Sequence, residues 1–272
     1  MKMLLKDGKR KVLTLSYDDG VIFDKHLMEI LDKQGIKCTF NINSGCYYDN
    51  NEKGSWNRRL RKEDAIALYK NSGHEVAVHT LTHPHLEYMD SSSMIYEVTK
   101  DRKNLENDFG TIVRGMAYPF GTYNSDVVDV LKMCKIAYAR TVKSTYSFAL
   151  PDNWLVLNPT CHHSSQELMN LAKRFVENSS KSGVFMFYLW GHSYEFHDSD
   201  NWNIIEEFAE YIGGKEDIWY ATNIEIYDYV QAFYRLETSY DKKIIYNPTQ
   251  IDVWVELGNT PVLVKAGETV RL

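Results

Sequence analysis

The chain lacks the features that mark several large classes of protein. It has no Lys- or Arg-rich run and no basic stripe, and its 272 residues carry a formal net charge of -6. This balance gives no support to a nucleic-acid partner. No apolar window is long enough to cross a membrane, and the apolar patch near the start is too short for a signal peptide. The sequence as printed is therefore expected to belong to a cytoplasmic protein, with a trimmed export signal as the alternative.

Cysteine is also scarce. The four cysteines are Cys38, Cys46, Cys134 and Cys161, and their spacings match no zinc ribbon and no CxxC motif. A disulfide framework is not expected in a chain this long with so few cysteines. Cys38 and Cys161 lie inside apolar runs, which indicates reduced thiols in the core.

What the chain does contain is an alternation of short apolar runs and amphipathic segments. Hydrophobic residues make up 44% of it and charged residues 25%, so a sizeable core is available. Strands are predicted at residues 12–17, 38–42, 75–79, 113–118, 136–141, 154–160, 184–190 and 218–222. Helices are predicted at 23–35, 62–73, 91–110, 125–135, 165–179, 203–214 and 223–236. This rhythm predicts a parallel sheet covered by helices, either a (β/α) barrel or a doubly wound sheet.

The rhythm changes after residue 236. Three short strand-like segments follow, divided by turn signals such as Asn247-Pro248 and Gly258-Asn259. We therefore expect a main α/β domain at residues 1–236 and a small antiparallel β-rich extension at residues 237–272.

Titratable side chains collect at the predicted carboxyl ends of the strands, where functional residues gather in barrels and open α/β sheets. In chain order they are Asp18, Asp19, His79, His83, Arg140, His162, His163 and His192. Each signal alone has an ordinary explanation, because Asp-Asp-Gly is a common turn and a histidine pair four residues apart often arises by chance. His162 and His163 are neighbours, so we expect at most one of them to face a site.

Together these residues predict metal chemistry. Two histidines four residues apart and one carboxylate suit zinc or another divalent transition metal. Such a site leaves a coordination position for water, lowers the pKa of that water and polarises a substrate carbonyl. One of the adjacent aspartates would bind the metal while the other accepts a proton, and a histidine from another strand end would serve as general acid.

The segments YDDG, HTLTH, AYPFG and LWGH, in this order, resemble the motifs of the polysaccharide deacetylases, the NodB-homology carbohydrate esterases of family 4. The resemblance covers about residues 12–236. It implies a distorted (β/α) barrel of about seven parallel strands, with the small C-terminal antiparallel β appendage outside it and residues 1–236 as the catalytic domain. It also implies a hydrolase that removes N-acetyl or O-acetyl groups from a sugar or polysaccharide. The implied cofactor is a divalent metal, zinc first, with cobalt, nickel or manganese as alternatives.

The resemblance also assigns roles to individual residues. It makes Asp18 the general base, His192 the general acid, and Asp19, His79 and His83 the metal ligands. It places Tyr118, Pro119 and Phe120 along the acetyl groove, where a backbone N–H near Phe120 would stabilise the oxyanion. Trp190 is a further candidate for contact with the substrate.

The sequence departs from the family pattern in two places. Ala117 stands where the family usually has an arginine that orients the base, and the Asp-Trp element that tunes the acid histidine is missing. We hypothesise that Arg140, at the end of the neighbouring strand, supplies the guanidinium to Asp18. His162 or His163 would replace the missing partner near the substrate, with His163 as a candidate substrate-binding residue and a core role as the alternative.

Other functions stay open at this point. The same fold and metal would suit a cyclic amide or another small non-peptide C–N bond, and Ala117 favours a catalytically weak carbohydrate-binding protein. Retention of both Asp18 and His192 argues against a mere binder. A glycosidase is disfavoured, because its two carboxylates must flank a sugar at roughly 5–9.5 Å. The sequence makes no prediction of the oligomeric state.

Overall fold

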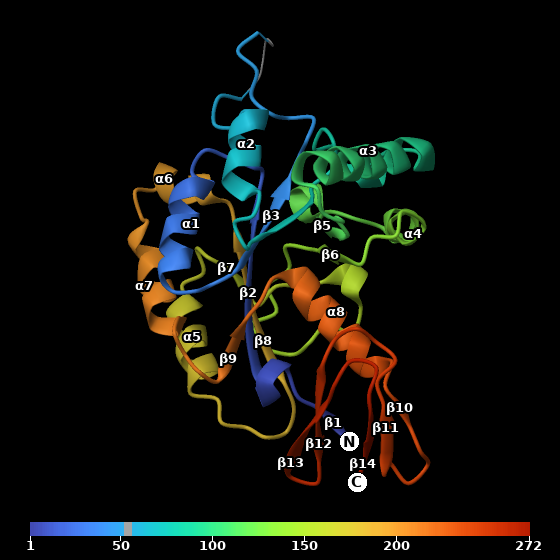
Figure 1. The fold of residues 1–272 in the computed structure, drawn as a ribbon. Coiled ribbons are helices and arrows are strands. Elements are labelled where there is room, and N and C mark those ends of the chain that lie inside the picture. The colour runs from blue at the N-terminus through green and yellow to red at the C-terminus, as the bar shows by residue number, and fades with distance from the viewer. Residues whose placement is uncertain (52–55) are drawn as a thin grey trace.

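The computed structural model describes residues 1–51 and 56–272, and its centre is a curled parallel sheet (Figure 1). Seven strands follow the order β6-β5-β4-β3-β2-β8-β7, and an eighth, β9, pairs with β2. Their bounds are β2 (Lys11–Asp18), β3 (Cys38–Ile42), β4 (Glu75–Val78), β5 (Gly115–Ala117), β6 (Tyr138–Arg140), β7 (Cys161–His162), β8 (Phe185–Gly191) and β9 (Ile218–Tyr220). The expected distorted (β/α) barrel is confirmed, and the doubly wound sheet is not observed.

Strand β2 is an inner strand of this sheet and pairs with three other strands. All eight of its residues are buried, as expected for a parallel strand that is covered on both faces. It pairs with β8 along almost its whole length, with β9 at Lys11 to Leu13 and with β3 at Leu15 to Asp18. Its carboxyl end therefore delivers Asp18 and Asp19 into the middle of the barrel mouth.

In the part of the chain that the structure describes, eight α-helices cover the sheet (Figure 1). They are α1 (Asp24–Lys33), α2 (Lys62–Tyr69), α3 (Ser91–Phe109), α4 (Ser125–Met133), α5 (Leu168–Val176), α6 (Ser193–Asp198), α7 (Asn203–Ile212) and α8 (Asn223–Tyr234), with 3₁₀ turns η1 (Lys6–Gly8), η2 (Leu86–Tyr88), η3 (Pro119–Gly121) and η4 (Trp154–Val156). Helix α3 illustrates how the sequence sets these bounds. The Asp90 side chain accepts hydrogen bonds from the first backbone N–H groups, and Gly110 ends the helix in the left-handed conformation.

Two sequence predictions need correction. The predicted strand at 154–160 is wrong, because residues 154–156 form η4 and the strand, β7, begins only at Cys161. The Asn153 side chain accepts a hydrogen bond from the Leu155 backbone and turns the chain there, so the apolar run is not extended. The other correction is α6, which the sequence did not predict, because a helix of six residues is too short to show a periodic apolar face.

The C-terminal residues form the expected antiparallel appendage. One sheet joins β12 (Val253–Leu257) and β13 (Thr260–Val264) to β1 (Lys2–Met3), and the other joins β10 (Glu237–Thr238), β11 (Ile244–Tyr246) and β14 (Thr269–Arg271). A separate apolar cluster of Ala232, Ile245, Val253, Val255 and Val264 fixes the appendage to the end of α8. Both chain ends thus lie at the bottom of Figure 1. The division into domains at residue 236 stays a prediction.

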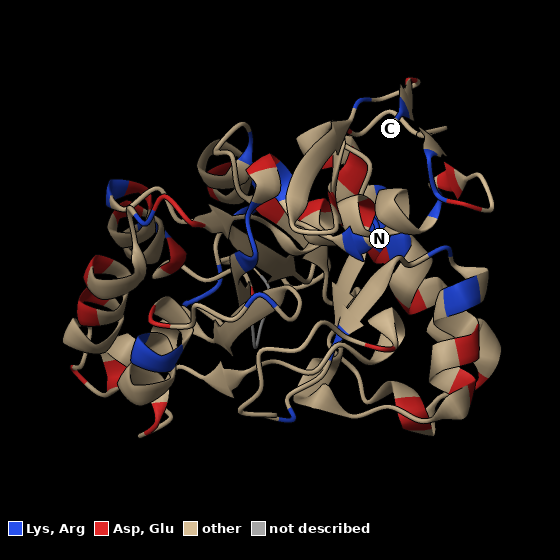
Figure 2. Cartoon of the chain, turned by 90° about the horizontal axis from the view of Figure 1, so that it is seen from below, with Lys and Arg blue, Asp and Glu red and all other residues tan. Residues whose placement is uncertain are grey.

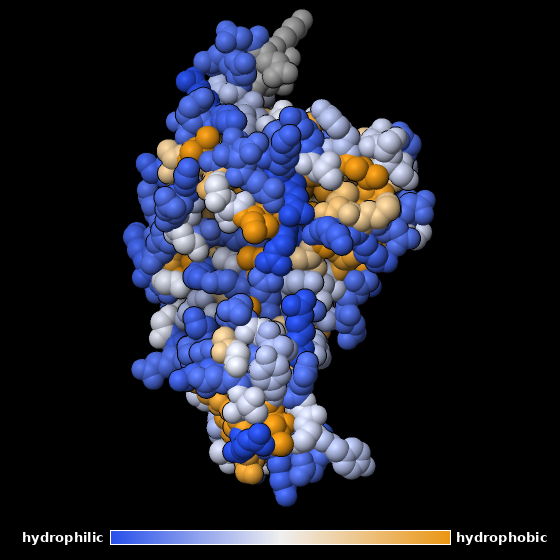
Figure 3. All heavy atoms as spheres, turned by 45° about the vertical axis from the view of Figure 1, so that its right-hand side comes forward, coloured by the Kyte–Doolittle hydropathy of each residue, from blue (hydrophilic) through white to orange (hydrophobic). Residues whose placement is uncertain are grey.

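The outer surface is mixed in character. Figure 2 shows Lys and Arg interspersed with Asp and Glu over the outer helices and loops. The face in Figure 3 is mostly hydrophilic, with hydrophobic side chains in separate small groups, one of them over the C-terminal strands. Among the described residues, no helix combines the length and the apolar character needed to cross a membrane. The four cysteines are free thiols, and Cys38 and Cys161 are buried, as expected.

Candidate active site

A cavity of about 460 Å³ opens at the carboxyl ends of the strands. It is lined by Asp18, Asp19, His79, His83, Tyr118, Phe120, Gly121, Val142, Trp190, His192 and Tyr194. The structure thus brings together, at one end of the barrel, residues that lie up to 176 positions apart in the chain. This volume is within the range of roughly 300–1,000 Å³ that small-ligand pockets occupy.

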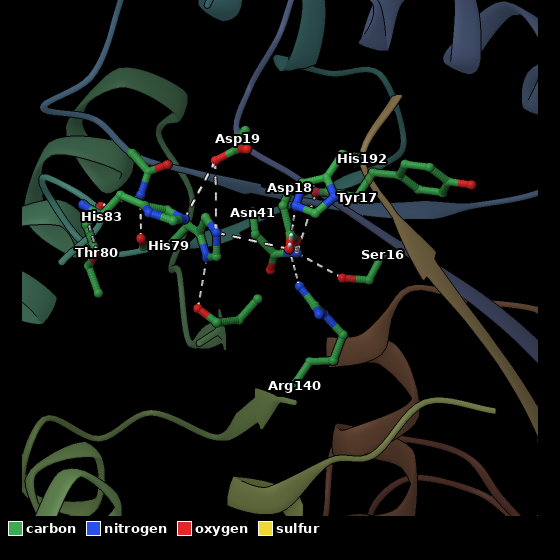
Figure 4. Close-up of polar contacts among 12 residues, drawn as sticks. Ser16, Tyr17, Asp18, Asp19, Asn41, His79, Thr80, His83, Arg140 and His192 are labelled. Atoms are coloured by element: carbon green, nitrogen blue, oxygen red, sulfur yellow. Dashed lines mark hydrogen bonds and ion pairs between the residues drawn. The ribbon is translucent and has the colours of Figure 1, made fainter. Parts of the chain in front are cut away.

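Asp19, His79 and His83 form a candidate metal-binding group, with one donor atom from each lying within 4.8 Å of the others. Asp19 Oδ1 is 3.9 Å from His79 Nε2 and 3.8 Å from His83 Nε2 (Figure 4). His79 Nδ1 lies 2.9 Å from the Ala117 carbonyl, which holds a proton on Nδ1 and leaves Nε2 free. One carboxylate and two imidazoles that converge in this way fit a divalent transition metal.

The electrostatics of the two histidines also fit a metal. Burial lowers the pKa of His79, and the charges of Asp18 and Asp19 oppose this only in part. Burial and the neighbouring His79 lower the pKa of His83 to about 4. Both rings are therefore neutral near pH 7, which is the form that binds metal ions.

Strained backbone conformations occur in and around the candidate metal-binding group. Four residues other than glycine have positive φ angles here: Asp19 (86°), Thr80 (66°), His83 (60°) and Phe120 (57°). Such conformations are costly and tend to persist where the surrounding structure imposes them, often at functional sites. Asn43 holds part of this backbone, because its Nδ2 donates to the carbonyl oxygens of His79 and Thr80.

Asp18 faces inward, away from the Asp19 carboxylate (Figure 4). Arg140 donates to its Oδ2 in a fully buried ion pair, and Asn41 Nδ2 donates to its Oδ1 over 2.8 Å. Burial by itself would raise the pKa of Asp18, but Arg140, His79 and His192 outweigh that effect and lower the pKa to about 2. The structure therefore places Arg140 where the sequence hypothesis put it.

His192 lies on the other side of Asp18, with its Nε2 3.9 Å from Asp18 Oδ2. Its Nδ1 is 3.4 Å from Oε1 of Glu195, a distance for an ion pair rather than a well-aligned hydrogen bond. Burial lowers the pKa of His192, but Glu195, Asp18 and Asp19 outweigh it, so the net pKa is raised. The sequence analysis missed Glu195. Its position three residues after His192, as in a capping box at the start of α6, is the signal that would have found it.

Arg59 is a second residue that sequence reasoning missed. Its Nη2 donates to Asp19 Oδ1 over 2.8 Å, and its Nη1 donates to the Asp19 carbonyl and to Asn43 Oδ1. The guanidinium thus fixes the same carboxylate oxygen that faces His79 and His83. Arg59 lies in a loop with no motif around it, so nothing in the sequence marks it.

The predicted substrate residues divide into two groups. Tyr118, Phe120 and Trp190 line the cavity, whereas Pro119 is buried and does not line it. His163 is also turned away from the cavity and only 3% exposed, because its ring is packed among aromatic side chains. Neither His162 nor His163 lines the cavity, which agrees with the expectation that at most one of them would face it, but their side chains do not point in opposite directions. Both Nε2 atoms converge on Glu195, because β7 ends at His162 and the chain turns there.

The fold and these residues define a (β/α) barrel protein with a carboxylate–histidine site at the mouth of the barrel. Residues 5–139 match the family model described as polysaccharide deacetylase. This part of the chain is therefore similar to the polysaccharide deacetylase family, which confirms the resemblance carried by the motifs within it. The match covers the segments with Asp18, Asp19, His79 and His83 but ends before Arg140, His192 and Glu195.

One curated protein is similar to part of the chain. The chain is 27% identical over 119 residues to "Chitin deacetylase 1" of Cryptococcus neoformans var. grubii, which covers 43% of this chain and 23% of that protein. It therefore spans about a quarter of that relative's length.

Two solved structures share the fold. A polysaccharide deacetylase-like protein from Mycobacterium smegmatis has a TM-score of 0.60 at 18% identity, and the alignment covers 86% of this chain and 95% of that one. The chitin deacetylase from Colletotrichum lindemuthianum has a TM-score of 0.53 at 20% identity, covering 83% and 89%. At these identities the likeness shows the fold alone.

Proposed function

We propose that this protein is a metal-dependent hydrolase that removes acetyl groups from a sugar or polysaccharide, N-acetyl in preference to O-acetyl. The observation that carries the proposal is the convergence of the metal-binding group, Asp18 and His192 on one cavity. These are the parts that amide hydrolysis needs: a ligand set, a base and an acid. The match of residues 5–139 to the polysaccharide deacetylase family supports an acetylated carbohydrate as the substrate.

Asp19, His79 and His83 would hold the metal ion, with zinc as the first choice for this donor set. When bound there, zinc supplies a Lewis acid that polarises the acetyl carbonyl and lowers the pKa of water. The neutral rings of His79 and His83 leave the carboxylate as the only charged ligand among the three.

Asp18 would take the proton of the attacking water. Its buried ion pair with Arg140 keeps the carboxylate ionised, and the hydrogen bond from Asn41 holds Oδ1, so that Oδ2 faces the cavity side with His79 and His192. Because Arg140 and Asn41 fix both oxygens, the base is oriented before the substrate arrives.

His192 would donate a proton to the departing nitrogen when the C–N bond of the acetamide breaks. Its raised pKa favours the protonated form that a general acid needs. Water adds to the acetyl carbon, the amine leaves with the proton from His192, and acetate and a free amino sugar result. The 3.9 Å between His192 Nε2 and Asp18 Oδ2 is short enough for the acid and the base to act on the same reacting group.

Aromatic side chains at the cavity suit a sugar ring. Phe120 is 52% exposed at the rim and stacks on His85 with the ring centroids 3.8 Å apart. Trp190 and Tyr194 also line the cavity, and the ring of each lies near the His192 ring. Flat aromatic faces at a cavity mouth give apolar contact area to the C–H face of a sugar.

Metal analysis with an acetate assay tests the proposal. The purified protein should contain one divalent ion and release acetate from N-acetylglucosamine oligomers faster than from acetylated xylan. His79→Ala should lose both the ion and the activity. His26→Ala, which removes an exposed histidine of α1, is the matched control and should keep both.

Asp18→Asn tests the base separately. It should keep the metal ion and lose roughly 10²–10⁴-fold in turnover, the usual size of a general-base contribution. A wild-type protein without metal, or His79→Ala with unchanged metal content, would overturn the metal site. Hydrolysis of a cyclic amide without release of acetate would overturn the substrate class.

A further inference from the structure

Glu195 is the meeting point of three histidines. Its Oε2 lies 3.1 Å from both His162 Nε2 and His163 Nε2, and accepts a hydrogen bond from the His192 backbone N–H over 3.2 Å. Its Oε1 lies 3.4 Å from His192 Nδ1. A single carboxylate therefore contacts a ring nitrogen of each of His162, His163 and His192.

His163 is locked in place on the side of Glu195 away from the cavity. Its ring stacks on Tyr17 and on Phe196, with centroid distances of 5.7 Å and 4.0 Å. It also occupies the space in front of Gly191, where a Cβ atom would lie only 2.0 Å from His163 Nδ1. Glycine at position 191 thus makes room for this ring.

The protonation of His163 follows from its surroundings. Burial lowers the pKa of His163 to about 4, so the ring is neutral near pH 7 and carries one proton. Nδ1 has no hydrogen-bond partner among the described residues, whereas Nε2 faces Glu195. The proton therefore lies on Nε2, where it is donated to the carboxylate.

His162 supports Glu195 from the other side. Its Nδ1 lies 2.7 Å from the Ser164 hydroxyl and accepts from the Ser164 backbone N–H, which leaves Nε2 as the donor to Glu195. Its ring also meets Trp190 edge-on at 4.6 Å. The carboxylate is thus held by two histidines that do not themselves line the cavity.

We propose that Glu195 is the positioning residue for His192, and that His162 and His163 are present to hold Glu195 in place. The inference rests on the proposed function, in which His192 is the general acid. With Nδ1–H directed at Glu195, the other ring nitrogen, Nε2, is presented to the cavity and to Asp18. The carboxylate charge also stabilises the protonated ring until the leaving group takes the proton.

In the family, an Asp-Trp element tunes the acid histidine, and this chain lacks it. Glu195 takes over that role from a different place in the fold. It comes from the first turn of α6, three residues after the histidine that it orients. The charged groups that face His192 are Asp18 and Asp19 from β2 and Glu195 from α6, with neutral His163 behind the last. Removing Glu195 leaves both aspartates in place, so its effect is separable from theirs.

NMR of the histidine rings tests this without any substrate. In protein labelled at histidine, with and without one equivalent of zinc, Glu195→Gln should make the His192 ring titrate at lower pH than in wild type. Glu206→Gln, an exposed residue of α7, is the matched control and should leave the titration unchanged. An unchanged His192 titration in a folded Glu195→Gln protein would overturn the inference.

Kinetics give a second readout. Glu195→Gln should lower kcat by roughly 10-fold or more, but by no more than the roughly 10²–10⁴-fold that a general acid itself contributes, while KM and metal content stay close to wild type. The alkaline limb of the kcat profile should move to lower pH, because the acid loses its proton earlier. Loss of a bound metal ion in Glu195→Gln would instead show that the His162–His163–Glu195 cluster binds metal, and would overturn the inference.

A second variant and a comparison with the wild type test the inference if the first variant fails to fold or if the proposed function is wrong. If Glu195→Gln does not fold, His162→Asn removes one of the two supports and should produce the same changes at smaller size; a folded His162→Asn protein with wild-type titration and kinetics would overturn the inference. Failure of the wild type to release acetate from any acetylated sugar would refute the proposed function, and the NMR titration would still decide whether Glu195 controls His192.

Discussion

Asp18 and Asp19 are adjacent in sequence and differ in almost every contact. Asp18 ends β2 and points into the barrel toward Arg140 and Asn41, whereas Asp19 turns outward toward His79 and His83. Successive side chains of a strand point to opposite sides, and the positive φ of Asp19 comes where the chain leaves β2. Two like charges side by side are thereby given separate cationic partners, Arg140 for the first and Arg59 for the second.

At the residue scale, a substitution of Arg140 tests its role in stability and in catalysis. It is fully buried, it pairs with Asp18, and its guanidinium lies 4.5 Å over the Trp190 ring. Arg140→Met keeps an unbranched side chain and removes the charge. Breaking a buried pair in this way should cost roughly 3–5 kcal/mol of the free energy of unfolding. Turnover should also fall, because Asp18 loses the group that keeps it ionised and oriented.

The pH profile separates these two effects. Without Arg140, burial raises the pKa of Asp18, so the acid limb of kcat/KM should move to higher pH. Arg235→Met, which removes an exposed arginine after α8, is the control and should change neither stability nor rate. An Arg140→Met protein with wild-type turnover and pH profile would refute the role of Arg140.

Individual residues were predictable where they lie on regular strands. The position of Arg140 followed from its place at the end of the strand next to Ala117, and the two strands do pair, with Ala117 opposite Arg140. Arg59 was not predictable, because it reaches Asp19 from an irregular loop whose path no local pattern sets. Glu195 was missed because its role depends on histidines brought near it by the fold of the chain between 163 and 191.

At the scale of elements, helix α3 supports the segment that carries His79 and His83, the two histidines of the candidate metal-binding group. Glu97 and Asp101 are four residues apart and so lie on one face of the helix. Glu97 accepts hydrogen bonds from the Thr82 backbone and hydroxyl, both over 2.9 Å. Asp101 accepts one from the His79 backbone over 3.1 Å. The helix thus holds the chain at His79 and Thr82, the residues that precede the strained Thr80 and His83.

Glu97→Ala should weaken metal binding while the fold is retained. The expected loss in affinity is roughly 10–100-fold, the usual size when a group that orients a ligand is removed. Metal titration of the apo-protein measures it, and circular dichroism checks the helix content. Lys103→Ala changes an exposed residue of the same helix and should bind metal as the wild type does. Equal affinities in the two variants would show that α3 does not hold the site.

Elements were predicted well where the apolar pattern is long. The strand at 38–42 and the helix bounds of α1, α3 and α8 fall within a few residues of the sequence prediction. The misses, η4 and α6, are short and are defined by side-chain hydrogen bonds to the backbone rather than by periodicity.

At the scale of the whole molecule, contacts between residues far apart in the chain could not be predicted from the sequence. Lys2 and Met3 pair with Glu256 and Val255, and Arg10 forms an ion pair with Glu256. Tyr229 adds a hydrogen bond to the Leu4 carbonyl and accepts one from the Trp254 backbone. The contacts of residues 2–10 join segments more than 220 residues apart, and no local pattern of charge or hydropathy specifies them.

One buried carboxyl links three helices across the molecule. Asp24, at the start of α1, accepts hydrogen bonds from Tyr69 of α2 over 2.6 Å and from Ser193 of α6. It also accepts one from the Val21 backbone over 3.1 Å. Burial raises the pKa of Asp24 to about 7, and these hydrogen bonds offset that effect only in part. Folding therefore favours the protonated carboxyl.

This raised pKa predicts how stability depends on pH. An unfolded aspartate has a pKa of about 3.9, so the contribution of Asp24 is fully present below about pH 4 and is lost as the pH rises through about 7. The loss amounts to roughly 4 kcal/mol of the free energy of unfolding, of which roughly 3 kcal/mol falls above pH 5. Urea unfolding at pH 5 and pH 8 should show this decline in wild type and in Asp152→Asn, an exposed control, but a smaller decline in Asp24→Asn. Equal declines in all three proteins would contradict a buried, protonated Asp24.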